Sequence, residues 1–232
     1  MNLQVSGEPH ILHCDNHILA VGKPAGWPIV PDSSGDRSLF DWAKDWIKRE
    51  FDKPGEVFLG VVHRLDRPVS GVVVFGRTSK GADRLSRAWR ESRVSKEYEA
   101  WTDAPPANTC GSRLVVGETC EREQWLWKDR ERNIVRLVAP ETEGAKLART
   151  RFEVLAIDDG LHLKLEPITG RSHQLRLLCA HGLRAPIRGD LKYGAREAMA
   201  GRRIALHATR LRFPHPTRDE EIALEWPTSF EL

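Results

Sequence analysis

A single carboxylate stands among basic residues in the stretch from Val61 to Phe75. Asp66 is the only acidic residue there, and Arg64 and Arg67 lie two and one positions away from it. Neighbouring guanidinium groups favour the charged form of a carboxyl group, so we expect Asp66 to stay ionised in a partly dry site. An ionised carboxylate in such a site can act as a nucleophile or as a general base. The alternative is structural, with Asp66 capping a turn and pairing with a neighbouring Arg.

Two apolar runs flank this charged loop. The runs 61–62 and 72–75 are rich in β-branched residues and are bounded by turn-forming residues, which predicts two short buried strands. Loops that are held between rigid strands often carry catalytic residues. The segment between these strands is therefore the first candidate site.

The order of residues in this loop resembles a known catalytic motif. His63-Arg64-Leu65-Asp66, followed by Ser70-Gly71, is similar to the catalytic motif of the RluA-type pseudouridine synthases, which isomerise uridine in RNA. The chain departs from this motif at Val69, where the family commonly has Thr. Five more segments resemble family motifs and follow the family's order: Lys23-Pro24-Ala25-Gly26, Lys96-Glu97-Tyr98, Gly170 to Arg176, Gly189 to Gly194 and Leu206-His207-Ala208. One short match is weak, but six in order are a specific signal.

The resemblance implies roles for four residues. Asp66 corresponds to the catalytic carboxylate, Tyr98 to the tyrosine that lies against the target base, and Arg171 to the arginine that pairs with the carboxylate. Arg64 corresponds to the residue that enters the RNA near the extruded base, where a planar cation can both stack and bind phosphate. The isomerisation requires no redox group or external group, so we expect no cofactor and no metal.

Positive charge is concentrated in one part of the chain. From Arg171 to Arg212 there are ten Lys or Arg residues against two acidic residues, whereas the net charge of the whole chain is +3. Such a distribution favours a surface that follows phosphates, although a solvated basic face explains it equally well. We expect an rRNA or tRNA stem-loop as the partner. The expected RNA-binding residues are Arg64, Arg67, Lys96, Arg176, Arg188 and Lys192.

The remaining elements are expected from periodicity and from capping residues. Apolar residues at helical spacing follow Ser38 and Ser79, which predicts two capped helices, and a third helix is expected between Gly170 and Gly182. Alternating patterns predict further strands at 11–14, 18–21, 94–101, 151–155 and 161–166. Shorter pieces at 113–116, 124–127 and 133–138 are expected to form edge hairpins with an unspecified influence on RNA choice.

Length and composition predict a single catalytic domain over residues 1–232, with two subdomains around one cleft. The resemblance implies the pseudouridine synthase fold, a mixed α/β (α+β) fold with a mainly antiparallel central sheet and flanking helices. We expect no separate N-terminal RNA-binding module before Lys23. The chain has no basic start followed by an apolar run, no stretch of 18 apolar residues and no C-x-x-C pair. It is therefore expected to be a cytoplasmic monomer that does not bind membranes.

Two other functional classes remain open from the sequence. A catalytically silent RNA-binding protein would explain the basic region, but it would not need Asp66, Tyr98 and Arg171 together. A hydrolase that uses Asp66 with a Glu or a His is disfavoured, because the chain has no G-x-S-x-G, H-E-x-x-H or P-loop pattern.

Overall fold

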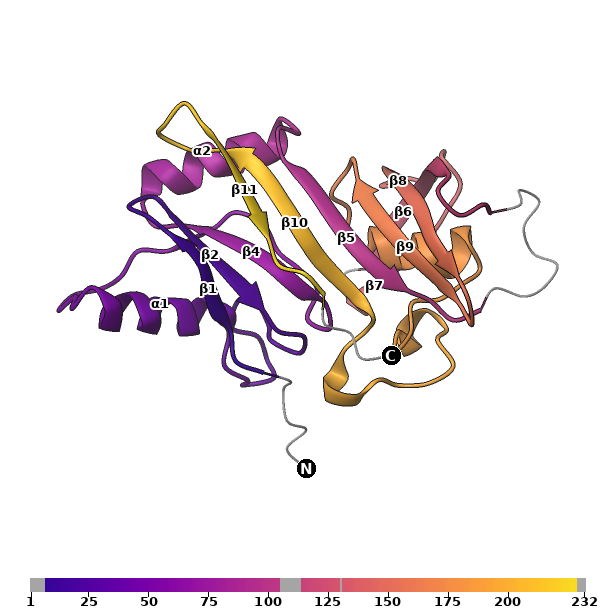
Figure 1. Ribbon diagram of the computed structural model, residues 1–232, viewed down its shortest axis with the longest axis horizontal. Coiled ribbons are helices and arrows are strands. Elements are labelled where there is room, and N and C mark those ends of the chain that lie inside the picture. The colour runs from indigo at the N-terminus through magenta and orange to yellow at the C-terminus, as the bar shows by residue number, and fades with distance from the viewer. Residues whose placement is uncertain (1–6, 105–113, 130, 229–232) are drawn as a thin grey trace. The chain divides into compact units, whose positions relative to one another are not determined.

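The computed structural model describes residues 7–104, 114–129 and 131–228 (Figure 1). The chain divides into two compact units, each built from segments that are far apart in the sequence. Unit 1 comprises residues 1–96, 201–203 and 208–231, and unit 2 comprises residues 97–200, 204–207 and 232. No helix among the described residues is long and apolar enough to cross a membrane.

Unit 1 contains a series of short strands joined mainly by antiparallel pairing. They are β1 (His10–Cys14), β2 (Ile18–Lys23), β3 (Gly60–Val61), β4 (Ser70–Gly76), most of β10 (Leu206–Pro214) and β11 (Glu221–Glu225). β2 pairs with both β1 and β4, β3 pairs with β4, and β11 pairs with β10, each time in antiparallel register. The strands expected at 11–14, 18–21 and 72–75 are confirmed.

Burial explains why the central strands of unit 1 have nearly continuous apolar sequences. Ile18 and Ala20 of β2 pack with Val72 and Val74 of β4 in one hydrophobic cluster. Side chains from α2, β10 and β11 complete this cluster: Leu85, Leu211, Phe213 and Leu224. Each fully buried aliphatic side chain contributes roughly 1.5–3 kcal/mol to folding, so this core fixes the strands that border the Asp66 loop.

The two helices of unit 1 begin at their capping residues. α1 (Leu39–Glu50) follows Ser38, whose hydroxyl oxygen accepts a hydrogen bond from the Asp41 backbone amide, as the capping-box pattern predicts. α2 (Ser79–Arg90) begins where we expect it, but Thr78 is its cap and accepts from the Gly81 amide. The prediction of Ser79 as the cap was therefore wrong by one residue, because Ser and Thr are both good caps.

The turn between β1 and β2 is fixed by one carboxylate. The Asp15 side chain accepts hydrogen bonds from the backbone amides of His17 and Ile18, and it pairs with His215 and Arg218 near β11. Burial acts to raise the pKa of Asp15, but the hydrogen bonds from His17, His215 and Ile18 hold this pKa far below its usual range. The described residues contain no group of three or more His, Cys, Asp or Glu that could hold a metal ion.

Unit 2 is an antiparallel sheet with one helical segment. Its strands are β5 (Ser95–Trp101, which begins in unit 1), β6 (Thr119–Asp129), β7 (Ile134–Leu137), β8 (Lys146–Ile157) and β9 (Leu161–Pro167). They pair in the order β5-β9-β8-β6-β7, each time antiparallel. This confirms the strands expected at 94–101, 151–155 and 161–166 and the mainly antiparallel α+β fold.

Two expectations for unit 2 need correction. The helix expected between Gly170 and Gly182 begins only at Gln174. Its α-helical part is α3 (Gln174–Leu177), and a π-helical turn, Leu178–Gly182, follows. The expected strand at 113–116 falls partly outside the described residues, and its described part, 114–116, is a loop and turn. The pieces at 124–127 and 133–138 belong to one hairpin formed by β6 and β7.

Candidate active site

Asp66 lies in a short loop between β3 and β4 whose apolar residues anchor it. Leu65 and Val69 are 8% and 3% exposed, whereas Asp66 between them is half-buried. The Val69 amide donates to the Asp66 carbonyl at 3.0 Å, which closes a tight turn. β4 then passes close to Ala208 at Gly71, where φ is +134° and a Cβ would lie 2.5 Å from the Ala208 backbone nitrogen. Only Gly fits there, which accounts for the Ser-Gly pair after the loop.

A buried lysine is hydrogen-bonded to the backbone of this loop. The Lys23 side chain is fully buried, and its Nζ donates to the backbone carbonyls of Pro24, Trp27 and Arg67 at 3.0–3.1 Å. The Gly26 amide donates to the same Arg67 carbonyl at 2.8 Å. The Lys-Pro-Ala-Gly turn therefore holds the peptide group between Arg67 and Pro68, one residue after Asp66.

Burial lowers the pKa of Lys23 to about 7, while the Asp66 charge acts to raise it and the Arg67 charge to lower it. Lys23 is thus electrostatically coupled to Asp66, a role that we did not predict for it. The signal was present in the sequence, because a lysine at the end of the otherwise apolar strand 18–23 must find polar partners.

Arg67 is directed to a neighbouring loop. Its Nε donates to the Gly26 carbonyl at 2.9 Å, and one terminal nitrogen donates to the Ser34 hydroxyl at 2.9 Å. The guanidinium also pairs with Asp36 and lies 3.5 Å from Asp32. These contacts give Arg67 a structural role, and its expected contact with RNA stays a prediction.

His63 and Arg64 are adjacent but lie in different environments. The His63 ring stacks on Trp89 at 4.7 Å, and its Nε2 accepts a hydrogen bond from the Val74 amide. Burial and the Lys96 charge lower the pKa of His63 to about 3, so this ring is neutral. Lys96 itself is half-buried, and desolvation lowers its pKa. Arg64 is exposed and forms no hydrogen bond or ion pair within the described part of the chain.

In unit 2 a buried glutamine shapes the segment that carries Arg171. The Gln174 Oε1 accepts from the Arg171 amide and the Thr169 hydroxyl, and its Nε2 donates to the Arg149 carbonyl and the Thr150 hydroxyl. The Arg171 side chain is exposed, and its Nε donates to the Leu147 carbonyl at 2.9 Å. Gln174 is therefore an organising residue that we did not single out from the sequence.

Three other expected RNA-binding residues also lie in unit 2, and they differ in exposure. The Arg176 side chain is 7% exposed and forms two 2.7 Å hydrogen bonds with Asp190, so it has a structural partner, and its expected contact with RNA stays a prediction. Arg188 is half-buried and donates to the Thr102 carbonyl and to Asp159. Lys192 is exposed and donates to the Asn133 carbonyl at 2.5 Å.

The register of unit 2 assigns Tyr98 to one face of the sheet. Residues directly opposite each other in an antiparallel pair point to the same face, and Tyr98 is opposite Leu165, which is opposite Phe152. α3 covers this face, because its Leu177 packs with Ala148, which is four residues before Phe152 on β8. Asp66 belongs to unit 1, so its expected pairing with Arg171 stays a prediction.

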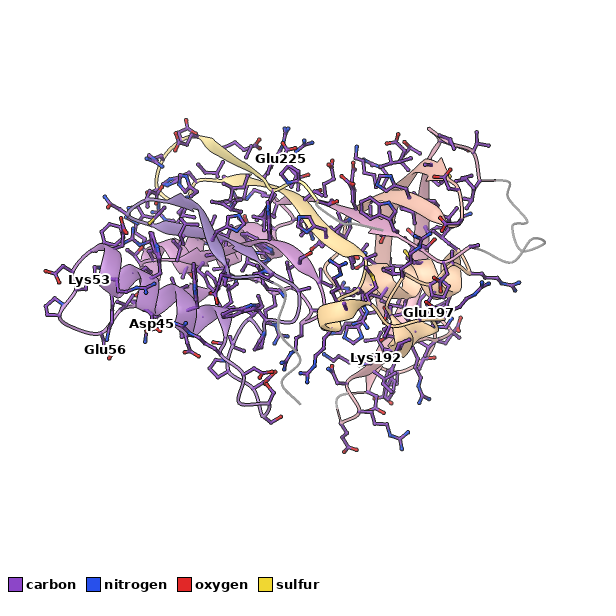
Figure 2. All side chains as sticks on the ribbon, turned by 60° about the horizontal axis from the view of Figure 1, so that its bottom comes forward. Asp45, Lys53, Glu56, Lys192, Glu197 and Glu225 are labelled. Atoms are coloured by element: carbon purple, nitrogen blue, oxygen red, sulfur yellow. The ribbon has the colours of Figure 1, made fainter. Side chains whose placement is uncertain are left out.

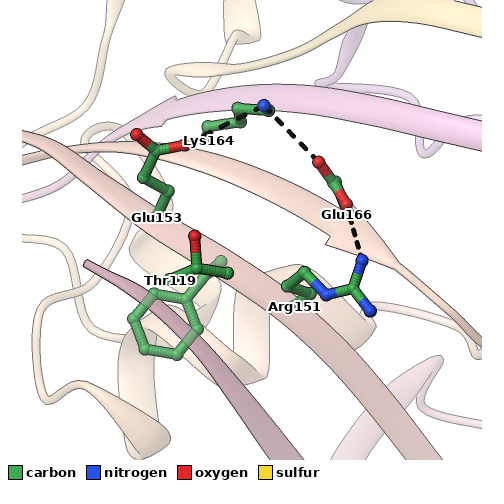
Figure 3. A pocket seen from close by; sticks show the side chains of 6 residues that line it. Thr119, Arg151, Glu153, Lys164 and Glu166 are labelled. Carbon is green, nitrogen blue, oxygen red and sulfur yellow. Dashed lines mark ion pairs between the residues drawn. The ribbon is translucent and has the colours of Figure 1, made fainter. Parts of the chain in front are cut away.

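The opposite face of this sheet carries a network of ion pairs around a shallow pocket (Figure 3). Lys164 lies 3.9 Å from Glu153 and 3.5 Å from Glu166, and Glu166 also pairs with Arg151. Thr119 completes the polar lining of this space of about 360 Å³. Because its cations are already matched by carboxylates, we do not assign the active site to this pocket.

Comparison with known proteins agrees with the motif order. Residues 17–181 match the family model described as RNA pseudouridylate synthase. The chain is 35% identical over 229 residues to the dual-specificity RNA pseudouridine synthase RluA of Haemophilus influenzae, covering 96% of this chain and 95% of that protein. It is 33% identical over 225 residues to the protein of the same name from Escherichia coli, covering 95% and 93%. Among solved structures, human RNA pseudouridylate synthase domain containing 4 superimposes with a TM-score of 0.73 at 25% identity, covering 94% of this chain and 88% of that one.

Proposed function

Since the chain belongs to the RNA pseudouridylate synthase family and is an RNA pseudouridine synthase, we propose that Asp66 is its catalytic carboxylate and that it acts on a uridine in an rRNA or tRNA stem-loop. The observation that supports Asp66 most directly is the construction of its loop. Lys23 donates to the carbonyl next to Asp66, and the flanking Leu65 and Val69 are buried. A carboxylate that is held in this way has few conformations to lose when substrate binds.

The reaction rearranges uridine without adding or removing atoms. The N1–C1′ glycosidic bond breaks, the freed uracil turns, and C5 bonds to C1′. The proton lost from C5 is balanced by one gained at N1. Asp66 serves this sequence either by attacking a ribose carbon or by removing a proton, and both routes need it ionised.

The other proposed residues act on the uracil and on the carboxylate. Tyr98 holds the uracil while it is detached, because a flat ring with a hydroxyl group can stack and can reach a polar edge. Arg171 pairs with Asp66, and a guanidinium also stabilises oxyanion character on the detached base. The exposure of the Arg171 side chain, with one guanidinium nitrogen fixed by Leu147, supports this role.

Arg64 acts before the chemistry, when the base leaves the stack. A stacked uridine hides the reacting atoms, and extruding it costs about a few kcal/mol. A guanidinium that fills the vacated space recovers part of that cost by stacking and by contact with phosphate. The exposure of Arg64 supports this assignment.

The substrate class is proposed from the relatives. The RluA proteins of Haemophilus influenzae and Escherichia coli are named dual-specificity enzymes, so we propose that more than one RNA is a substrate here. We also propose that the enzyme is cytoplasmic and that it acts as a monomer on rRNA or tRNA.

The test is tritium release from RNA labelled at uracil C5, with total tRNA and rRNA as separate substrates. The wild-type enzyme should release tritium from at least one of them. Asp66→Asn should abolish release, because the amide is uncharged, while RNA binding stays within about twofold of wild type. Glu56→Gln is the matched control, since Glu56 is an exposed carboxylate in the same unit whose ion-pair partners among the described residues are Lys44 and Lys48. Equal release by Asp66→Asn and wild type would remove Asp66 from the mechanism.

A further inference from the structure

The β6–β7 hairpin had no clear role from the sequence, yet three contacts tie it to the segments that carry Arg171 and Lys192. The Lys128 Nζ on β6 donates to the Ser172 hydroxyl at 3.4 Å. The Lys192 Nζ donates to the Asn133 carbonyl at the turn of the hairpin. The Tyr193 hydroxyl accepts from the Val135 amide on β7 at 3.1 Å. All of these residues belong to unit 2.

A small core makes this attachment firm. Leu126 of β6 and Val135 of β7 are each 3% exposed and pack with Leu177, Ala180 and Tyr193. The Tyr193 hydroxyl also bonds the His173 ring, which lies between Ser172 and α3. The hairpin is thus part of the structure that positions the 171–173 segment.

Strand register shows which side of the hairpin Lys128 occupies. Phe152, on the Tyr98 face, is opposite Cys120 on β6. Alternate residues of a strand share a face, so the side chains from Cys120 through Leu126 to Lys128 lie on that same face. The contact between Lys128 and Ser172 agrees with this assignment. Arg136 is opposite Trp127 and therefore lies on the other face.

Lys128 also has charge that the protein does not neutralise. It is exposed, and no carboxylate pairs with it among the described residues. Arg171, Ser172 and Lys192 are likewise exposed (Lys192 is labelled in Figure 2). Lys128 contacts Ser172, which follows Arg171, and Lys192 contacts the turn of the same hairpin. All four side chains can donate hydrogen bonds to phosphate oxygens.

From this arrangement we propose that the β6–β7 hairpin is an RNA-binding element, in which Lys128 together with Lys192 binds backbone phosphates of the substrate beside Arg171. This inference rests on the proposed function, because it takes the Tyr98 face as the face that meets RNA. Lys128 is a positioning residue in this scheme. It does not touch the reacting atoms, and it fixes the strand that delivers the uridine.

The test is the salt dependence of RNA binding by Lys128→Gln and Lys192→Gln, measured by anisotropy with a fluorescein-labelled RNA stem-loop. Arg136→Gln is the matched control, because it removes the same charge from the opposite face of the same hairpin. Each Lys variant should weaken binding about three- to fivefold at low salt. Each should also make the slope of log K against log salt about 0.7–0.9 less steep. Arg136→Gln should leave both quantities unchanged.

Conservative replacement separates a phosphate contact from a merely structural one. Lys128→Arg keeps the charge and should restore both affinity and slope, and thermal denaturation should show every variant folded. In single-turnover assays, Lys128→Gln should need about three- to fivefold more RNA than the wild-type enzyme to reach its half-maximal rate. Affinity and slope for Lys128→Gln equal to those of Arg136→Gln would overturn the inference. The binding readout needs no turnover, so it stands apart from a failure of tritium release, which would count against the proposed function alone.

Discussion

At the scale of single residues, adjacent side chains in the catalytic loop have different tasks. His63 is neutral and stacked, Arg64 is exposed, and Leu65 is buried. Asp66 is half-buried, and Lys23 donates to the carbonyl of the next residue, Arg67. An ammonium group has three N–H donors, and Lys23 uses them on three carbonyls. Burying the charge of Lys23 costs free energy. Its three hydrogen bonds offset part of that cost and fix these carbonyls.

The pH dependence of stability should report this buried charge. Lysine ordinarily titrates near pH 10.5, and the pKa of Lys23 is lowered to about 7 by burial. Between these values the unfolded chain holds a proton that the folded protein has released. The free energy of unfolding should then rise with pH across this window, by at most about 1.4 kcal/mol per pH unit.

Lys23→Met removes this titration, so urea denaturation of both proteins at pH 7, 8 and 9 isolates it. The wild-type protein should gain stability relative to Lys23→Met as the pH rises. Parallel pH profiles would show that Lys23 keeps an ordinary pKa in the folded protein.

Arg64 and Arg67 form a natural pair for a second prediction. Arg64→Ala should slow the single-turnover rate about tenfold or more at saturating RNA, because base extrusion loses its stacking partner, and should leave stability nearly unchanged. Arg67→Ala should mainly lower the denaturation midpoint, since it removes contacts with Gly26, Ser34 and Asp36. Single-turnover kinetics and urea denaturation of both variants measure the two effects. A normal rate for Arg64→Ala would exclude its role in extrusion.

These two arginines also show what residue type alone can predict. Sequence motifs predict roles for Asp66, Arg64 and Arg171, because the order of the motifs along the chain is specific, and these roles stay predictions. The sequence did not distinguish Arg64 from Arg67 or Arg176, because the partners of a guanidinium come from distant segments such as 32–36 and 190. Burial of a basic residue is decided by packing, which composition does not encode.

At the scale of elements, regular alternation predicted strands well and helices less completely. β9 alternates apolar and polar residues, which fits its half-buried position, and Ser38 marked the start of α1. The helix after Gly170 begins later than expected, because His173 has a positive φ of 54° and Gln174 uses its side chain on the preceding turn. The pieces expected at 124–127 and 133–138 belong to the β6–β7 hairpin, but the first half of β6 was not predicted, because residues 119–123 are mostly polar and show no apolar alternation.

The Arg176–Asp190 pair connects α3 to the segment that carries Lys192, so its loss should lower the free energy of unfolding. Arg176→Gln leaves the Asp190 carboxylate, which is 1% exposed, without its charged partner. We expect a loss of about 3–5 kcal/mol in the free energy of unfolding, as for other broken buried ion pairs. Arg188→Gln, which removes a half-buried guanidinium paired with exposed Asp159, is the control and should cost about 1 kcal/mol or less. If Arg176→Gln left the free energy of unfolding unchanged and made the slope of log K for RNA against log salt less steep, Arg176 would be an RNA-binding residue.

At the scale of the whole molecule, the placement of charged side chains is more informative about RNA binding than the net charge. The net charge of +3 predicts little affinity for RNA by itself. On the face of the unit 2 sheet opposite to Tyr98, carboxylates already pair with Lys164 and Arg151. Lys128, on the Tyr98 face, and Arg171 are exposed and form no ion pair with a carboxylate among the described residues, and Lys192 is exposed as well. We therefore expect the RNA to contact the exposed Lys128 and Arg171 and not the face that carries Lys164.

This arrangement gives a quantitative expectation for RNA binding. If Arg64, Lys128, Arg171 and Lys192 each neutralise one phosphate of a single-stranded loop, the slope of log K against log salt should be about −2.8, four times −0.7. Arg151→Gln removes a cation from the face opposite to Tyr98 and should leave this slope unchanged, whereas Lys128→Gln should reduce its magnitude. Anisotropy titrations from about 50 to 200 mM salt span the range in which this difference is resolved. A slope near zero, or a change with Arg151→Gln as large as that with Lys128→Gln, would contradict the one-sided arrangement.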